Sequence, residues 1–206
     1  LQTLRADIRL GLTGIAVGSE RDGAVGFFDK QLLAQARDFL ISGRGSGRHG
    51  ETLIAYHGDG DGCCSAYFLQ KLIGGPIRFY WIPTPDFDFL KAERHIMGLR
   101  PELTIFLDMP VYNRPELIEG LGHHGKVFIY DHHHPGLCDV CQGMNNVLYI
   151  NPVILEEAEA FPTALFAWEL LGESSRFEKD VLFMALFTES AFITCMRMNR
   201  LERREV

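Results

Sequence analysis

The sequence lacks any apolar run that approaches the roughly 18 residues needed to cross a membrane. Its N-terminus also lacks the charged-then-apolar pattern of a signal peptide, and no internal repeat or low-complexity segment is present. We therefore expect a cytoplasmic protein with no membrane partner. The 206 residues, 47% of them hydrophobic and 23% charged, suffice for one domain with a sizeable core.

An excess of positive charge is missing as well. Lys and Arg number 20 against 27 Asp and Glu, which gives a formal net charge of −7. Because affinity for long nucleic acids comes mainly from basic contacts to phosphates, this balance argues mildly against a wrapped duplex. It favours single strands or short oligonucleotides as nucleic-acid substrates.

Cysteines are few and odd in number. There are five, and Cys63 and Cys64 are adjacent, which favours reduced thiols over a framework of disulfides. Cys138 and Cys141 form a CxxC that could be half of a zinc site, but no second CxxC follows. We expect free thiols and no structural disulfide.

What is present is an alternation of helical and strand-like segments. An amphipathic pattern over 26–41 precedes a Gly- and Arg-rich segment, 42–50, that is typical of a linker. Apolar runs at 52–56, 77–82, 103–107, 126–130 and 147–150 then alternate with helical patterns. This order predicts an α/β fold with a mostly parallel, Rossmann-like sheet flanked by helices. We expect residues 1–48 to form an N-terminal helical extension and linker, and 49–206 to form the main domain.

Acidic and imidazole side chains follow three of the predicted strands. TLIAY leads into HGDGDG at 57–62, LTIFL leads into Asp108, and KVFIY leads into DHHH at 131–134. Ligands of open parallel sheets bind beyond the carboxyl ends of the strands, so these side chains should gather at one edge. The glycines between His57, Asp59 and Asp61 permit a tight turn, and we expect Gly62 to begin the following helix.

A cluster of carboxylates repels itself unless cations compensate it. Oxygen ligands with one or two imidazoles suit Mn²⁺ or Mg²⁺ better than a closed zinc site, and Mn²⁺ ranks first because histidines are present. Two such ions can stabilise both developing charges of an in-line displacement at phosphorus. The pattern therefore points to hydrolysis of phosphate esters.

Two other interpretations of GDGDG fail on spacing. The dinucleotide-binding loop requires GxGxxG, whereas this segment reads GxGxG. A calcium loop counted from Asp59 would place Cys63 and Gln70 where an oxygen ligand and a glutamate belong.

Together, HGDGDG, the aspartate of IFLDMP and DHHH resemble the first three motifs of the DHH phosphoesterase family over roughly residues 50–195. That family includes RecJ-like exonucleases, short-oligonucleotide hydrolases, cyclic dinucleotide phosphodiesterases and manganese pyrophosphatases. The resemblance implies a two-metal site with bridging Asp108. His57 and Asp59 would hold one ion, and Asp61 and His132 the other. His133 would face the scissile phosphate, and Asp131 would orient the imidazoles.

The fourth family motif is the weakest part of the resemblance. Family members supply an aspartate after a late helix, whereas LFTESAF at 186–192 offers Glu189. Its longer carboxylate could still bind the second ion, or Glu189 could be a helix-surface residue. Asn151 after VLYI could contact substrate or only form a turn.

The resemblance predicts a metal-dependent phosphodiesterase or exonuclease that acts on single-stranded DNA or short oligonucleotides. Two alternatives stay open: an inactive relative that serves as a scaffold in a nucleic-acid-processing complex, and a pyrophosphatase or polyphosphatase. Family members usually carry a smaller substrate-binding domain after the catalytic one, and nothing here corresponds to it. We expect the chain to be a fragment of a longer polypeptide.

Overall fold

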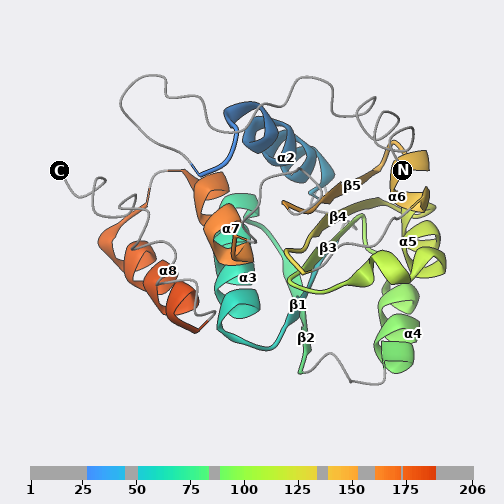
Figure 1. The fold of residues 1–206 in the computed structure, drawn as a ribbon. Coiled ribbons are helices and arrows are strands. Elements are labelled where there is room, and N and C mark those ends of the chain that lie inside the picture. Colours follow the sequence, from blue (N-terminus) through green and yellow to red (C-terminus); the bar gives the residue numbers. More distant parts are fainter. Residues whose placement is uncertain are drawn as a thin grey trace, which may run out of the picture.

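The computed structural model describes residues 27–44, 51–83, 89–133, 139–152, 161–172 and 174–188. Their five strands form one sheet in the order β2-β1-β3-β4-β5, and every neighbouring pair is parallel (Figure 1). The strands are β1 (Thr52–His57), β2 (Ile77–Ile82), β3 (Leu103–Leu107), β4 (Lys126–Tyr130) and β5 (Val147–Ile150). The predicted α/β fold with a parallel sheet is confirmed.

Helices cover both faces of this sheet (Figure 1). One face carries α2 (Lys30–Gly43), α3 (Gly60–Ile73) and α7 (Thr163–Leu171), and α8 (Arg176–Thr188) packs against α3 and α7. The other face carries α4 (Phe89–Leu99), α5 (Pro115–Gly122) and the short α6 (Asp139–Gly143). A 3-10 turn, η1 (Val111–Asn113), follows β3.

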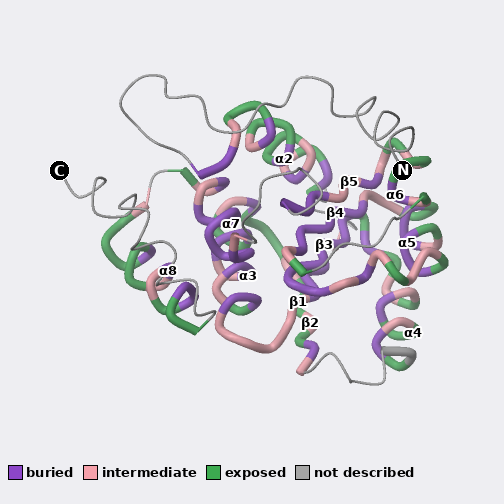
Figure 2. Tube along the Cα trace, viewed as in Figure 1, coloured by how far each residue is buried: buried purple, intermediate pink, exposed green. Residues whose placement is uncertain are grey.

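The central strands are apolar along their whole length because both of their faces are covered. Ile54 of β1 packs in the core beneath α2, α3 and α7, whereas its neighbours Leu53 and Ala55 pack beneath α4 and α5. All five residues of β3 are buried. Figure 2 shows the same burial along the middle of the sheet. Continuous apolar runs of this kind are typical of parallel strands enclosed by helices.

The strand order places a topological switch point between β1 and β3. The chain leaves β1 through α3 on one face to reach β2, and it leaves β3 through α5 on the other face to reach β4. Such neighbours open a crevice beyond their carboxyl ends, where open α/β sheets bind ligands. The HGDGDG segment and Asp108 follow these two strands.

The first helix of the described residues, α2, packs in the helical layer on one face of the sheet. Leu32, Ala36 and Leu40 of α2 are buried in the same core as the helices α3 and α7. The Glu169 carboxylate of α7 accepts hydrogen bonds from the backbone N–H groups just before α2, at Phe27 (2.8 Å) and Phe28 (3.2 Å). The predicted boundary between an N-terminal extension, 1–48, and the main domain stays a prediction. The buried residues of α2 belong to the same hydrophobic core as residues of the sheet.

Cysteine chemistry differs in part from the expectation. Cys63 and Cys64 are free thiols. Cys141 is disulfide-bonded, so the expectation of no disulfide is wrong. The number and adjacency of cysteines do not show whether a particular pair forms a disulfide. Pairing depends on which thiols the fold brings together.

None of the helices in the described ranges is both long enough and apolar enough to cross a membrane.

Candidate metal centre

The segment after β1 turns directly into α3. Asp59 is the N-cap of this helix, and its Oδ1 accepts a hydrogen bond from the N–H of Gly62 at 2.9 Å. Its other oxygen, Oδ2, lies 2.8 Å from Nδ1 of His57. The helix therefore begins at Gly60, two residues before the predicted start, because the N-cap carboxylate satisfies an amide of the first turn.

The glycines of this turn are required by close packing. A Cβ added at Gly62 would overlap the backbone carbonyl of His57, and one at Gly60 would overlap the side chain of Thr188. At Gly58 it would overlap the indole of Trp81. Glycine thus lets the strand end, the helix start and the last turn of α8 approach one another around His57 and Asp59.

Asp108 follows β3 in a backbone conformation that few residues adopt. Its φ is 61°, in the left-handed region, which aspartate tolerates better than most non-glycine residues. Its backbone N–H still donates to the Tyr130 carbonyl at 3.0 Å and so extends the β3–β4 ladder. The side chain is buried, with Oδ2 3.4 Å from His57 Nδ1 and Oδ1 3.0 Å from His132 Nε2.

The segment after β4 is held by Asp131, which is fully buried. Its Oδ1 lies 2.6 Å from Nδ1 of His133 and accepts a hydrogen bond from the His133 backbone N–H at 3.3 Å. Asn151, buried after β5, donates from Nδ2 to the His133 carbonyl at 3.0 Å. Asp131 thus contacts the imidazole of His133, one of those it was predicted to orient, and Asn151 supports the same turn from the next strand.

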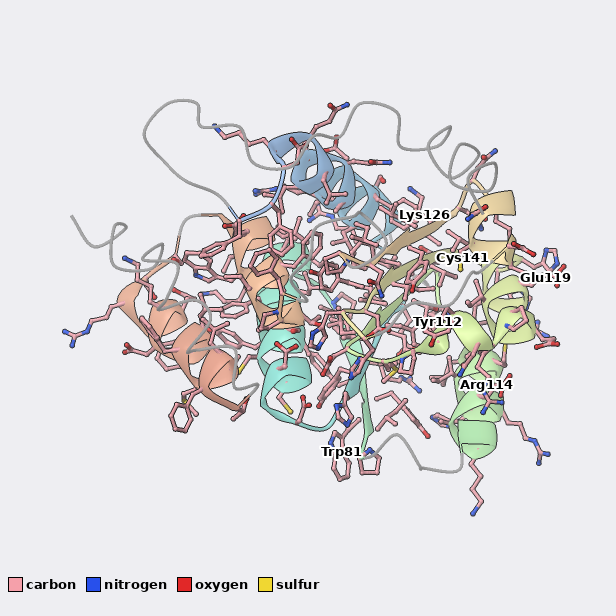
Figure 3. All side chains as sticks on the ribbon, in the orientation of Figure 1. Trp81, Tyr112, Arg114, Glu119, Lys126 and Cys141 are labelled. Carbon is pink, nitrogen blue, oxygen red and sulfur yellow. The ribbon has the colours of Figure 1, made fainter. Side chains whose placement is uncertain are left out.

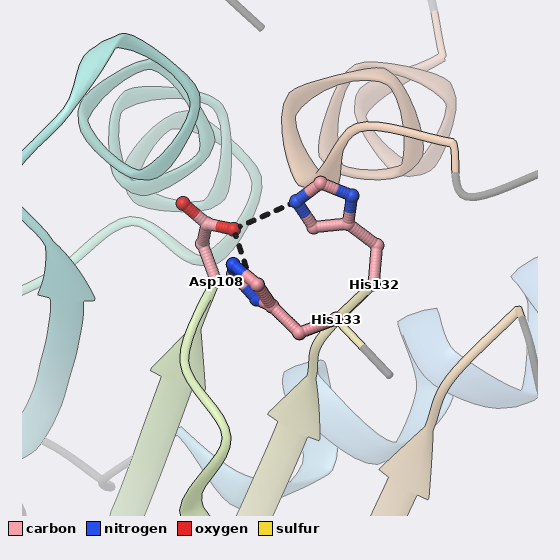
Figure 4. Close-up of side chains that lie close together, drawn as sticks. All are labelled: Asp108, His132 and His133. Atoms are coloured by element: carbon pink, nitrogen blue, oxygen red, sulfur yellow. Dashed lines mark hydrogen bonds and ion pairs between the residues drawn. The ribbon is translucent and has the colours of Figure 1, made fainter. Parts of the chain in front are cut away.

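These side chains form two groups of potential metal ligands that share one residue. His57, Asp59 and Asp108 make the first group, and Asp108, His132 and His133 make the second (Figure 4). In each group the three ligand atoms lie within 4.8 Å of one another. Asp108 thus stands where a carboxylate that bridges two ions would stand, as the family resemblance implies.

Unsatisfied polar atoms support a cation at this position. Among the described residues, the buried atoms His57 Nδ1, Asp108 Oδ2 and Asp131 Oδ2 make no hydrogen bond, although His57 Nδ1 is in ion-pair contact with Asp59 Oδ2. The first two lie 3.4 Å apart, although their geometry makes no hydrogen bond. Buried polar atoms without partners are costly, and a divalent ion would satisfy the two that converge.

The charges in the centre are strongly coupled. Burial alone would raise the pKa of Asp108, but the imidazoles of His132 and His57 lower it to about 2. The pKa of His57 is raised, chiefly by Asp108, and that of His133 is raised, chiefly by Asp131. A buried carboxylate that stays ionised among imidazoles is a suitable ligand for a divalent cation.

Asp61 has backbone partners that the sequence did not indicate, and its predicted role as a metal ligand stays a prediction. It is fully buried, and its two oxygens accept hydrogen bonds from the backbone N–H groups of Thr163 (2.8 Å) and Ala164 (2.7 Å) at the start of α7. Its Oδ2 lies 3.6 Å from His132 Nε2, but Asp61 completes neither group of ligands among the described residues. Burial, followed by the nearby Asp108, raises its pKa to about 7.

Three residues of interest in the sequence fall outside the described residues. Glu189 is not described, although Thr188, which precedes it, packs against Gly60 between Asp59 and Asp61. His134 is also outside the described residues, as is Cys138, which we considered as a zinc ligand. The metal role of Glu189 therefore stays a prediction.

Sequence reasoning missed two neighbours of the centre. The start of α7 reaches Asp61 from 102 residues further along the chain, and no local pattern indicates this contact. Trp81 is the last but one residue of the predicted strand IRFYWI, so its place near the carboxyl edge of the sheet was predictable from the strand. The contact of its indole with Gly58 was not predictable from the sequence.

No protein-family model and no curated protein matches the chain. Solved structures do match. "Crystal structure of exonuclease RecJ bound to manganese" superposes with a TM-score of 0.58 at 18% identity. The structure of RecJ from Thermus thermophilus in complex with Mn²⁺ superposes with a TM-score of 0.53 at 20% sequence identity. The structure of CDC45 from Entamoeba histolytica superposes with a TM-score of 0.54 at 12% sequence identity.

These alignments cover 76%, 76% and 86% of this chain but only 43%, 24% and 37% of the three structures. The chain therefore spans less than half the length of the proteins it matches. At the level of fold it is like the DHH phosphoesterases, which agrees with the motifs HGDGDG, IFLDMP and DHHH.

Proposed function

We propose that the chain is the catalytic part of a metal-dependent phosphodiesterase that cleaves single-stranded DNA or short oligonucleotides, in the manner of an exonuclease. The observation that carries the proposal is the sharing of Asp108 by two groups of ligands. Two structures with this fold are of RecJ with manganese, which supports Mn²⁺ as the metal, with Mg²⁺ as the alternative.

The residues around Asp108 would divide the binding of the two ions. His57 and Asp59 would hold one ion, His132 the other, and Asp108 both. Bound ions would neutralise the non-bridging phosphate oxygens and favour attack by water on phosphorus. Asp61 would act by fixing the start of α7 behind His132 and, once deprotonated, by offering the second ion an oxygen.

His133 would face the scissile phosphate. Its side chain is 46% exposed, and Asp131 engages Nδ1, so Nε2 is left for substrate. Asp131 also raises the pKa of His133, which favours the protonated form of its imidazole. During hydrolysis a water oxygen would bond to phosphorus and lose its proton to solvent, the ester P–O bond would break, and His133 would give its own proton to the leaving oxygen.

A scaffold without activity is the second candidate, and two observations favour it. Both oxygens of Asp61 are occupied by backbone N–H groups, and a CDC45 structure shares the fold. A pyrophosphatase or polyphosphatase would use the same ligands. We also propose a cytoplasmic location, which the free thiols of Cys63 and Cys64 favour and the disulfide of Cys141 does not.

The deciding experiment is hydrolysis in Mn²⁺ of three substrates: a single-stranded oligodeoxynucleotide, a dinucleotide and pyrophosphate. The proposal expects cleavage of the first two, with release of mononucleotides. Cleavage of pyrophosphate alone would favour the third candidate. If none of the three substrates is cleaved and calorimetry detects no Mn²⁺ binding, the result would support the scaffold without activity.

The proposal also includes a partner domain. A substrate-binding domain elsewhere in a longer polypeptide would close over the carboxyl edge of the sheet, in line with the greater length of the matched structures. A longer version of the polypeptide should then bind the oligonucleotide more tightly than this chain does.

A further inference from the structure

Two large aromatic side chains are exposed on the edge strand β2. Trp81 is 56% exposed and Phe79 is 40% exposed. They are two residues apart on a strand, so they project from the same face of the sheet. Phe79 is held by an edge-to-face contact with Tyr56 of β1, with ring centroids 6.2 Å apart. Figure 3 shows Trp81 at the end of β2, at the free edge of the sheet.

Trp81 lies directly beside the metal centre. Its indole packs so closely on Gly58 that any side chain there would overlap it. Gly58 separates His57 from Asp59, and both belong to the first group of ligands. A molecule that placed a phosphate on this group and extended past Gly58 would therefore meet the indole.

The chemistry of the indole limits what such a molecule can be. Exposed tryptophan offers a flat apolar surface, on which nucleobases stack irrespective of sequence. Pyrophosphate and polyphosphate carry no flat group that could use it. The protein's net charge of −7 gives no general attraction for a polyanion, so stacking would supply binding that charge does not.

We propose that Trp81, backed by Phe79, is the stacking surface for a nucleobase next to the phosphodiester at the metal centre. The inference rests on the proposed function and narrows its substrate class to strands that carry bases. Trp81 would act on substrate affinity and positioning, while the ligands around Asp108 would act on the chemistry.

The test compares wild type with Trp81→Ala and Trp81→Phe. The probes are a fluorescein-labelled octathymidylate and an abasic oligomer of equal length, and anisotropy is measured with Ca²⁺ in place of Mn²⁺. Wild type should bind the thymidylate about tenfold more tightly than the abasic oligomer, the gain expected for one stacked base. Trp81→Ala should remove that preference, and Trp81→Phe should keep most of it.

The matched control is Phe177→Ala, which removes an aromatic side chain that is 63% exposed on α8. It should leave both affinities unchanged. The chain's other tryptophan, Trp168, is 7% exposed, so quenching of fluorescence by octathymidylate should disappear in Trp81→Phe.

Failure of this inference can be told apart from failure of the proposed function. Equal wild-type affinity for the two oligomers, including no measurable affinity for either, would overturn the stacking surface whatever the activity. A Trp81→Ala protein that still prefers octathymidylate to the abasic oligomer would also overturn it. So would a Trp81→Ala protein whose only difference from wild type is its self-association on gel filtration. Hydrolysis in Mn²⁺ is scored separately, and its loss in wild type would overturn the proposed function alone.

Discussion

The Nε2 atom of His132 lies 3.0 Å from Oδ1 of Asp108, and this contact joins the carboxyl ends of β4 and β3. Oδ2 of the same carboxylate faces His57 at the end of β1. Three neighbouring strands of the sheet thus deliver ligands to one buried carboxylate. The arrangement makes Asp108 the residue on which both groups of potential ligands depend.

We expect Asp108→Asn to abolish hydrolysis and to weaken Mn²⁺ binding at both sites, because the neutral amide loses a bridging oxygen and the charge that attracts the ions. Activity should fall to less than about a tenth of wild type at saturating Mn²⁺. Asp38→Asn, at an exposed position of α2, is the charge-matched control and should retain activity. Full activity in Asp108→Asn would contradict the bridging assignment.

Gly62→Ala should destabilise the protein, because the new Cβ would overlap the His57 carbonyl. We expect the free energy of unfolding in urea to fall by about 2 kcal/mol, as for other overpacked sites, together with loss of Mn²⁺ affinity. Gly98→Ala in α4 is the matched control, since open space surrounds that position. It should leave stability unchanged or raise it by up to about 1 kcal/mol. A Gly62→Ala protein as stable as wild type would argue against the close packing of this turn.

Asn151→Ala separates a substrate contact from a supporting role. The Asn151 amide holds the His133 carbonyl, so its loss should misplace His133 and lower kcat about tenfold with KM nearly unchanged. A raised KM with unchanged kcat would instead support the contact with substrate that the sequence predicted. Thermal unfolding of both proteins shows whether the variant is folded.

Glu189 is tested by calorimetric titration of Mn²⁺ into three proteins. If it is a ligand, Glu189→Ala should weaken the second site and leave the first unchanged. Glu189→Asp should then weaken Mn²⁺ binding at the second site if the backbone there is adjusted to the longer glutamate. It should strengthen Mn²⁺ binding if the site has lost affinity because glutamate replaced the family's aspartate. Identical titrations for wild type and both variants would remove Glu189 from the centre.

The Glu178 cluster predicts a pH dependence of stability outside the metal centre. Lys71, and then Ser175, lower the pKa of this buried carboxylate to about 2 from an ordinary 4.5. A lowered carboxyl pKa contributes stability that is present above about pH 4.5 and lost as the pH falls towards about 2. As the pH is lowered from about 4.5 to about 2, the midpoint temperature of thermal unfolding should therefore fall more steeply in wild type than in Glu178→Gln. Glu102→Gln, at an exposed carboxylate, should follow wild type; parallel declines of wild type and Glu178→Gln would contradict the assignment.

Much of the fold was predictable because it depends on local patterns. The apolar runs at 103–107 and 126–130 are strands in the structure, and the segments between strands are helices. The meeting of His57, Asp108 and His132 followed from the same patterns, since parallel strands end at one edge. Helix starts were less accurate, because α3 begins where the Asp59 carboxylate caps it and apolar spacing carries no information about that contact.

The sequence by itself determined the alternation of strands and helices, the glycines of the turn and the ligand types that follow each strand, because these depend on near neighbours in the chain. Only the tertiary structure decided that Asp61 anchors α7, that Trp81 lies on Gly58, and that Asp108 joins two groups of ligands. Those contacts join segments far apart in sequence. They depend on strand order and helix packing, which fix distances that no local pattern encodes.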